Sequence, residues 1–362
     1  MDVTSRLALV KRNTIEIVTE DELRRAFEEG KKLKGYIGFE PSGIVHIGWL
    51  VWMYKFKDLV DAGVEMILFA ATWHAWINDK LGGDLNLIRA AARHVVKVLE
   101  AIGVDMSRVR VVYADELVND VRYWEKVLRI AKNVSLSRVK RALTIMGRKA
   151  SEAELDFSKL IYPLMQVADI FHMDLDIALG GIDQRKAHML ARDVAEKLGY
   201  KKPIAIHTPL LPSLRSATKM GSVQNVEIDE LYAEVKMSKS KPEDAIFIID
   251  SDEDIIKKIR AAYCPPKEVE SNPVMAIAKH IIFAQGDKRF VIERKPEHGG
   301  VVEVYSYEEL EKLYREGAIH PLDLKNAVAS ELIRIIKPIR SVLESDKELW
   351  MELEQIMQRV TR

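Results

Sequence analysis

The chain has 362 residues, and because a single hydrophobic core stops growing near ~250 residues, we expect two domains. Lysine plus arginine (55) equals aspartate plus glutamate (55), which excludes a uniformly basic surface for nucleic acid, and the single cysteine, Cys264, excludes an intramolecular disulfide and a zinc–thiolate cluster. No apolar run reaches the ~18 residues of a membrane span, and the charged N-terminus lacks the apolar segment of a signal peptide, so we expect a cytoplasmic protein with no membrane partner.

Strand-like and helix-like segments alternate through the first two thirds of the chain. This alternation predicts an α/β fold in which helices cover a Rossmann-like, doubly wound parallel sheet. The expected strands are residues 36–40, 64–71, 109–114, 175–180 and 203–207.

Two long helices are expected between these strands. Residues 47–63 are apolar on most sides until Lys55, which predicts a buried helix that ends at Gly63. Residues 84–103 repeat the pattern, with Asp84 as a possible N-cap and Gly103 as the stop.

The segment from about 115 to 157 is helical and charged, as expected of an insertion between the two halves of the sheet. Between 131 and 150 it carries six basic residues and no acidic one, namely Lys132, Arg138, Lys140, Arg141, Arg148 and Lys149. Such a run is more often a solvated helix face than a binding site.

After a last expected strand at 245–250, the pattern changes to helices alone, with Cys264-Pro265-Pro266 near the junction. We therefore expect an α/β domain at 1–250 and an all-α domain at 251–362.

The stretch GYIGFEPSGIVHIGW, residues 35–49, joins a strand to a helix through a Pro-Ser-Gly turn. Backbone N–H groups and the positive end of a helix suit an anion there, and His46 would add a donor. An ordinary tight turn beside a satisfied histidine is at least as probable on these residues alone.

A polar trio lies in KLIYPLMQVADIF, residues 159–171. Tyr162, Gln166 and Asp169 share one face of an otherwise apolar helix, and Pro163 is expected in its first turn, with Tyr162 at the helix start. Buried polar groups must be paired, and a small polar ligand is one way to pair them; an exposed polar stripe is the alternative. Gly180-Gly181-Ile182-Asp183-Gln184 follows the next strand, at the edge where open α/β sheets bind ligands.

The third motif is VKMSKSKP, residues 235–242. It is either an ordinary solvated loop or a loop whose Lys236 and Lys239 neutralise phosphate charge in a transition state.

Together these motifs resemble the class I aminoacyl-tRNA synthetases. KMSKS matches the second signature of that family, and HIGW matches its first, His-Ile-Gly-His, except at the last position. The segments YIGFEPSG, IYPLMQVADI, GGIDQRKAHMLAR, KKIRAAYCP and HPLDLKNAVA resemble the archaeal and eukaryotic tyrosyl type, in the family's order and over essentially the whole chain.

The resemblance implies that the enzyme activates L-tyrosine with ATP and Mg²⁺, with no tightly bound cofactor and no resident metal, and transfers it to tRNA(Tyr). It implies catalysis by His46, Lys239 and Lys236. It assigns the substrate phenol to Tyr36 and Asp169 and the amino end to Tyr162, Gln166 and Gln184. It assigns ATP contacts to Gly38, Gly43, His46, Gly48, Met237, Ser238 and Lys239.

For tRNA, the resemblance implies that Arg141, Arg185 and Lys186 contact the first acceptor base pair. It places His320, Pro321 and Asp323 in an anticodon-reading loop, although Asp323 also suits a helix N-terminus. A homodimer joined through the inserted region is implied as well, with residues 1–250 as the catalytic domain and 251–362 as the anticodon-binding domain.

Two positions depart from the family pattern. Trp49 replaces the second histidine of the first signature, and Thr72 stands where relatives commonly have aspartate. Altered ATP contacts or a weakened enzyme could follow from either. A tryptophanyl enzyme and a catalytically silent RNA-binding paralogue are the competing hypotheses; Tyr36 and Asp169 argue against the first, and the intact lysines argue against the second.

Overall fold

The computed structural model describes residues 1–146, 156–216, 236–239 and 241–360. The chain divides into two compact units, each built from more than one segment. The first unit comprises Met1–Gly43, Lys55–Pro209 and Glu348–Arg362, and the second unit comprises Ile44–Tyr54 and Leu210–Lys347.

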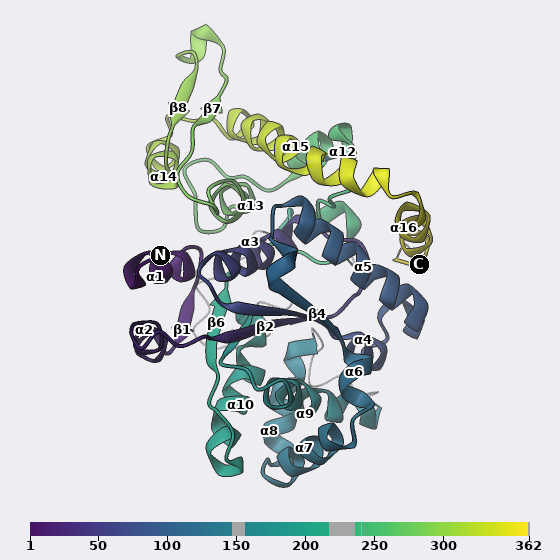
Figure 1. The fold of residues 1–362 in the computed structure, drawn as a ribbon. Helices are drawn as coiled ribbons and strands as arrows, with labels where there is room; N and C mark the ends of the chain where they lie inside the picture. The colour runs from purple at the N-terminus through teal and green to yellow at the C-terminus, as the bar shows by residue number, and fades with distance from the viewer. Residues whose placement is uncertain (147–155, 217–235, 240, 361–362) are drawn as a thin grey trace. The chain divides into compact units, whose positions relative to one another are not determined.

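The first unit is built on a mostly parallel sheet whose order is β1-β6-β5-β2-β3-β4 (Figure 1). Its five parallel strands confirm the five expected from the sequence. The edge strand β1 pairs antiparallel with β6 and was not expected, because its three half-buried residues carry no alternating pattern. The strands are β1 Glu16–Val18, β2 Lys34–Phe39, β3 Glu65–Ala70, β4 Val109–Tyr113, β5 Ile177–Gly181 and β6 Ile204–Thr208.

The strand order reverses between β2 and β5. The chain proceeds from β2 to β3 and β4 on one side and returns to β5 and β6 on the other. In open α/β sheets such a switch point holds the ligand, at the carboxyl ends of the strands. Glu40, directly after β2, and Gly181–Gln184, after β5, therefore lie where a ligand is expected.

Helices cover both faces of this sheet. Figure 1 shows α5 (Leu85–Ala101) on one side and α9 (Phe157–His172) and α10 (Arg185–Leu198) on the other. Asp84 caps α5 by accepting from the N–H groups of Asn86 and Leu87, and Gly103 follows the helix at φ 83°. None of the helices in the described parts of the chain is both long and apolar enough to cross a membrane.

The start of α9 differs from the prediction. The helix begins at Phe157, where the Asp156 side chain accepts from the Ser158 N–H, so Pro163 lies inside the helix and Tyr162 is not at its start. The capping aspartate outweighs the proline, which removes one hydrogen bond without ending the helix.

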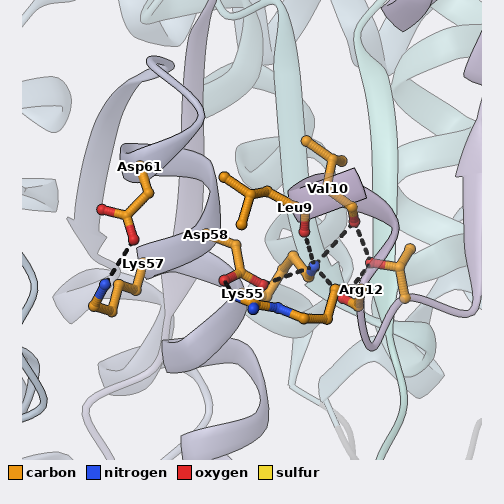
Figure 2. Close-up of polar contacts among 8 residues, drawn as sticks. Leu9, Val10, Arg12, Lys55, Lys57, Asp58 and Asp61 are labelled. Atoms are coloured by element: carbon orange, nitrogen blue, oxygen red, sulfur yellow. Dashed lines mark hydrogen bonds and ion pairs between the residues drawn. The ribbon is translucent and has the colours of Figure 1, made fainter. Parts of the chain in front are cut away.

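The helix α3 (Ile47–Asp61) is buried as predicted, and Lys55 is buried with it at 1% exposure. Figure 2 shows how the ammonium is satisfied: it donates to the carbonyl oxygens of Leu9 (2.8 Å), Val10 (2.9 Å) and Arg12 and to the Asp58 carboxylate (3.1 Å). Burial lowers the pKa of Lys55 to about 8 and Asp58 opposes the shift, so the side chain remains a cation at neutral pH. It thereby ties α3 to the carboxyl end of α1 (Val3–Lys11).

The predicted insertion is helical in its described part, through α6 (Ala114–Val118), α7 (Val121–Lys132) and α8 (Leu136–Ala142). Tyr123, Val127 and Ile130 bury one face of α7. Its other face leaves Val121 and Leu128 80% and 65% exposed.

The second unit is mostly helical, but two predictions about it were wrong. It contains an antiparallel hairpin of β7 (Phe290–Ile292) and β8 (Val302–Val304), whose three-residue strands are too short to show a period in the sequence. Residues 245–250 are not a strand, because Phe247 forms only an isolated bridge with His46. The main helices are α12 Asp252–Ala261, α13 Pro273–Ile277, α14 Tyr307–Glu316 and α15 Pro321–Ser345; α16 Lys347–Val360 follows.

Candidate active site

Asp169 is a buried carboxylate on α9, 2% exposed. One of its oxygens accepts a hydrogen bond from the Tyr123 hydroxyl at 2.8 Å, and the other lies 3.2 Å from Nε2 of His74. Tyr123 comes from α7 and His74 from α4 (Thr72–Ile77). Three elements therefore fix a negative charge inside an apolar cluster that also contains Tyr36.

The phenols around this carboxylate stay protonated. Burial raises the pKa of Tyr36 and of Tyr123 well above the ordinary value, and the charge of Asp169 raises both further. A protonated phenol can donate a hydrogen bond, whereas a phenolate beside a carboxylate would be repelled. Asp169 is thus an acceptor beside two phenols that stay protonated.

Glu40 is a site residue that the sequence analysis did not single out. It accepts from the Tyr162 hydroxyl at 2.5 Å and from the Asn78 amide at 3.0 Å. Burial raises the pKa of Tyr162 well above the ordinary value, and Glu40 adds to the shift. The available signal was its place directly after a buried strand, in the motif that begins the site.

Gln166 and Gln184 lie together at the carboxyl edge of β5. The Gln166 amide donates to Oε1 of Gln184 at 3.1 Å, and the Gln184 amide donates to the Ile145 carbonyl at 3.1 Å. Oε1 of Gln166 is buried with no hydrogen-bond partner among the described residues. Gly180 permits this packing, since a Cβ there would lie 2.9 Å from Cβ of Gln184. The pair offers an acceptor to a ligand's N–H groups.

The second unit holds the signature histidine. His46 is buried just before α3, where its Nδ1 accepts from the Gly48 N–H at 3.2 Å, so Nε2 carries the proton and can donate. Burial, followed by the charges of Lys239 and Lys236, lowers the pKa of His46 well below the ordinary value. His46 is therefore a neutral donor at physiological pH. A side chain at position 48 would displace the His46 ring, because a Cβ would lie 2.8 Å from Cε1 of His46.

The lysines of the third motif flank a buried anchor. Met237 is 4% exposed, and its N–H donates to the Leu211 carbonyl at 2.7 Å. Nζ of Lys239 lies 3.9 Å from the centroid of the Trp49 ring. Ser238 is described, whereas Val235 and Ser240 lie outside the described residues. Within this unit the structure thus brings Lys239 to the same first turn of α3 that follows His46.

The glycines predicted to approach ATP occupy different settings. Gly38 is exposed within the otherwise buried strand β2, which leaves its backbone open to a ligand. Gly43 is buried and has φ 129°, a conformation that glycine adopts without strain.

The predicted acceptor-stem residues all lie in the first unit. Arg141 is exposed at the end of α8, and Arg185 is 45% exposed with Nε 2.6 Å from the Glu16 carboxylate. Lys186 follows it, half-buried. Of the basic run, Arg138 forms an ion pair with Asp193 at 2.6 Å, which supports the alternative of a solvated face for that residue. Arg148 and Lys149 lie outside the described residues.

The predicted anticodon residues begin α15 in the second unit. His320 is its N-cap, with Nδ1 accepting from the Leu322 N–H at 3.2 Å; Pro321 is the first helical residue, and Asp323 is in the first turn. Asp323 therefore does sit at a helix N-terminus, where its charge is favourable whatever else it binds.

Thr72 is buried, and its hydroxyl donates to the Asp115 carboxylate at 3.3 Å. The same carboxylate accepts from Nε1 of Trp73 at 3.2 Å and pairs with Arg89 at 2.8 Å. Thr72 thus anchors the start of α4 in a network within the first unit.

Taken separately, the two units supply complementary parts. The first unit has a doubly wound sheet with a carboxylate and two amides at its switch point, a site for a small polar ligand. The second unit has a neutral histidine and a lysine beside a helix start, an arrangement suited to phosphate. Across the described residues, no cluster of three or more His, Cys, Asp or Glu side chains forms a metal site. These features define an α/β protein of the nucleotide-binding class.

Comparison with known proteins identifies the family. The model of the class I tRNA synthetases of the tryptophan and tyrosine group matches residues 28–337, and the chain belongs to this family. The tyrosine–tRNA ligase of Aeropyrum pernix is 61% identical over 362 residues, covering 100% of this chain and 99% of that protein.

Solved structures agree. The crystal structure of the tyrosyl-tRNA synthetase from Aeropyrum pernix has a TM-score of 0.88 at 57% identity and covers 99% of this chain and 100% of that one. The enzyme from Pyrococcus horikoshii, solved in complex with L-tyrosine, has a TM-score of 0.91 at 44% identity and covers 98% of this chain and 100% of that one. The predicted fold class and family are confirmed.

Proposed function

We infer that the protein is a tyrosine–tRNA ligase. It activates L-tyrosine with ATP to tyrosyl-adenylate and then transfers the tyrosyl group to the 3′ end of tRNA(Tyr). The observation that carries this function is the buried Asp169 carboxylate, held by Tyr123 at 2.8 Å among neutral phenols. Relatives named tyrosine–tRNA ligase, at 61% and 60% identity over the whole chain, support the same function.

Recognition of the substrate phenol is assigned to Asp169 and Tyr36. A carboxylate accepts from the phenolic O–H, and a protonated Tyr36 supplies a second polar partner. Phenylalanine has no O–H to offer, so its binding would desolvate the carboxylate without replacing the lost water, at about 1–3 kcal/mol or more for a charged group. This difference selects tyrosine.

The amino end of tyrosine is assigned to Tyr162, Gln166 and Gln184. Oε1 of Gln166, which has no hydrogen-bond partner in the described parts of the chain, supports this assignment, because it is a buried acceptor that an ammonium group would satisfy. Glu40 accepts from the Tyr162 hydroxyl at 2.5 Å and so holds that side chain in place.

Adenylation is assigned to His46, Lys236 and Lys239. The tyrosine carboxylate oxygen bonds to the α-phosphorus of ATP while the bond to the bridging oxygen breaks and pyrophosphate leaves. Negative charge increases on the phosphate oxygens, and the Nε2 proton of His46 and the two ammonium groups stabilise it. We assign the ATP contacts, with ATP as its Mg²⁺ complex, to Gly38, Gly43, Gly48, Met237 and Ser238.

In the second step a ribose hydroxyl of the tRNA attacks the activated carbonyl, and AMP leaves. We assign the acceptor end to Arg141, Arg185 and Lys186, which are basic and lie in the first unit with the tyrosine site. The anticodon is assigned to His320, Pro321 and Asp323. Residues 1–250 then form the catalytic domain and 251–362 the anticodon-binding domain.

We also propose a homodimer that uses α7. Val121, Trp124 and Leu128 follow one another at helical spacing on this helix and are 80%, 37% and 65% exposed. An apolar stripe of this kind on a helix surface marks an interaction site, and a second copy of the chain is the proposed partner. The protein is proposed to act in the cytoplasm, where tRNA is charged.

The function is tested by ATP–pyrophosphate exchange with L-tyrosine, L-tryptophan and L-phenylalanine in parallel. Exchange that depends on L-tyrosine is expected. Exchange with L-tryptophan alone, or no exchange with any of the three, would refute the inference; the first result favours the tryptophanyl alternative and the second the silent RNA-binding alternative.

The phenol assignment has its own test. Asp169→Ala is expected to abolish tyrosine binding in calorimetry, while Asp193→Asn, an exposed aspartate on α10, keeps it. Unchanged affinity of the Asp169 variant would remove this residue from the tyrosine site.

A further inference from the structure

Trp49 occupies the last position of the first signature, where the resembled family has a histidine. The sequence suggests only a loss there, of one donor near the phosphates. The structure places Nζ of Lys239 3.9 Å from the centroid of the Trp49 ring, within the second unit. The indole ring therefore faces the ammonium group of Lys239, a residue of the second signature, KMSKS.

Trp49 is a well-anchored platform. Its backbone N–H donates to the His46 carbonyl at 2.8 Å in the first turn of α3. Its ring lies 5.8 Å from that of Trp52, one turn further along the helix, and 6.3 Å from that of His46, which meets it edge-on at 63°. The indole is thus held between the donor histidine and a second indole.

A cation over an indole is attracted by the negative face of the ring, and tryptophan is the strongest of the aromatic partners. Lysine otherwise carries its charge on a flexible four-carbon stem, so a fixed partner reduces the rotamers available to it. Lys239 also lies close enough for its charge to lower the pKa of His46. His46 and Lys239, the two proposed donors to phosphate, therefore both lie next to the Trp49 ring.

We propose that Trp49 is a positioning residue that holds the Lys239 ammonium beside His46, so that the phosphate site is arranged before ATP binds. It replaces a hydrogen-bond donor by a support for the lysine. The proposal rests on the function inferred above and extends it to a residue whose part in the reaction is indirect.

The test compares variants of the full-length protein in which the cation–π interaction with Lys239 has different strengths. Trp49→Leu removes the aromatic ring, and Trp49→Phe keeps a ring that attracts a cation less strongly. We expect the kcat of tyrosine-dependent pyrophosphate exchange to fall in the order Trp, Phe, Leu, by about 2- to 30-fold for Leu, which is a cation–π strength of about 0.5–2 kcal/mol converted at 1.4 kcal/mol per tenfold. The Kd for tyrosine, measured without ATP, is expected to stay constant and also reports that each variant is folded.

A double-mutant cycle separates positioning from a general structural role. In a Lys239→Gln background, Trp49→Leu is expected to cause no further loss, because the group it positions is gone. Equal losses in both backgrounds would overturn the proposal, as would equal rates for Trp, Phe and Leu at position 49. Tyr305→Leu, which removes a 54% exposed aromatic ring of the second unit that the proposal does not use, is the matched control and is expected to retain the rate within about twofold, since surface substitutions usually have little effect.

If Trp49→Leu does not fold, Trp49→Phe carries the comparison, and a rate equal to that of the unmodified protein would refute the proposal. If the unmodified protein itself shows no tyrosine-dependent exchange, the proposed function has failed, which is distinct from a failure of Trp49 to act through Lys239.

Discussion

Replacement of Lys55 by methionine tests how α1 is held in the first unit. The ammonium is 1% exposed and donates to the Leu9, Val10 and Arg12 carbonyls and to Asp58 (Figure 2). Methionine nearly preserves the volume, so the loss is mainly electrostatic.

The expected loss of unfolding free energy depends on which other donors each hydrogen-bond acceptor of Lys55 retains after the substitution. Asp58 retains its ion pair with Arg12, and the Val10 carbonyl retains the Thr14 hydroxyl at 2.7 Å. The Leu9 and Arg12 carbonyls lose the ammonium donor, at about 1–3 kcal/mol each. Together with the lost attraction to Asp58, we expect Lys55→Met to lower the free energy of unfolding by about 3–5 kcal/mol, the usual range for a broken buried ion pair.

The neighbouring Lys57 provides a matched control. It forms an ion pair with Asp61 at 2.6 Å on the surface of the same helix (Figure 2), and Lys57→Met should lower the free energy of unfolding by only about 0.3–0.5 kcal/mol.

Urea unfolding followed by circular dichroism measures both losses, and hydrogen exchange shows whether the amides of α1 lose protection first. If Lys55→Met is as stable as the unmodified protein, the desolvation of the buried ammonium cancels its hydrogen bonds, and the reasoning fails.

Three further predictions concern the two sites and acid stability. Tyr123→Phe removes the donor to Asp169, so calorimetry should show tyrosine binding weakened about 10- to 100-fold, the effect of losing a hydrogen bond of about 1.5–3 kcal/mol to a charged group; unchanged affinity would contradict it. Gly48→Ala forces His46 to move and should slow pyrophosphate exchange about 10- to 100-fold at constant tyrosine affinity, whereas a normal rate would exclude His46 from that step. Burial lowers the pKa of His188 well below its ordinary value. As the pH falls below about 6.5, His188 therefore binds a proton in the unfolded state but not in the folded state, and the free energy of unfolding decreases. Between pH 7 and pH 5, the free energy of unfolding of His188→Leu should therefore decrease less than that of the unmodified protein, by a difference of up to about 2 kcal/mol. If the two plots of unfolding free energy against pH are parallel, His188 does not cause the acid sensitivity.

Elements with a long, regular pattern could be predicted from the sequence. The helix α3 was expected because its segment is apolar on most sides, and α5 because its apolar residues recur between a capping aspartate and a glycine; both patterns end at a glycine, Gly63 and Gly103, whose φ values are 81° and 83°. The strands β1, β7 and β8 have three residues each and show no period, so they could not be predicted. The start of α9 was misplaced because Asp156, not Pro163, determines where the helix begins.

For the site too, some residues could be selected from the sequence, whereas their partners could not. Asp169 could be selected from the sequence, because a carboxylate on an apolar helix face needs a partner. The identity of that partner could not, since Tyr123 lies 46 residues away on another helix. Glu40 was missed for the same reason: its partner Tyr162 is 122 residues distant.

The sequence by itself determined the alternation of strands and helices, the family signatures and the residue types available for chemistry, because these depend on local spacing and identity. Only the tertiary structure decided which of those residues meet. Trp49 demonstrates the difference. In the sequence it is only a departure from the family signature, which has histidine at this position, whereas in the folded chain the centroid of its ring lies 3.9 Å from Nζ of Lys239. A contact between residues 190 positions apart is formed by the packing of the whole unit, and no local pattern encodes it.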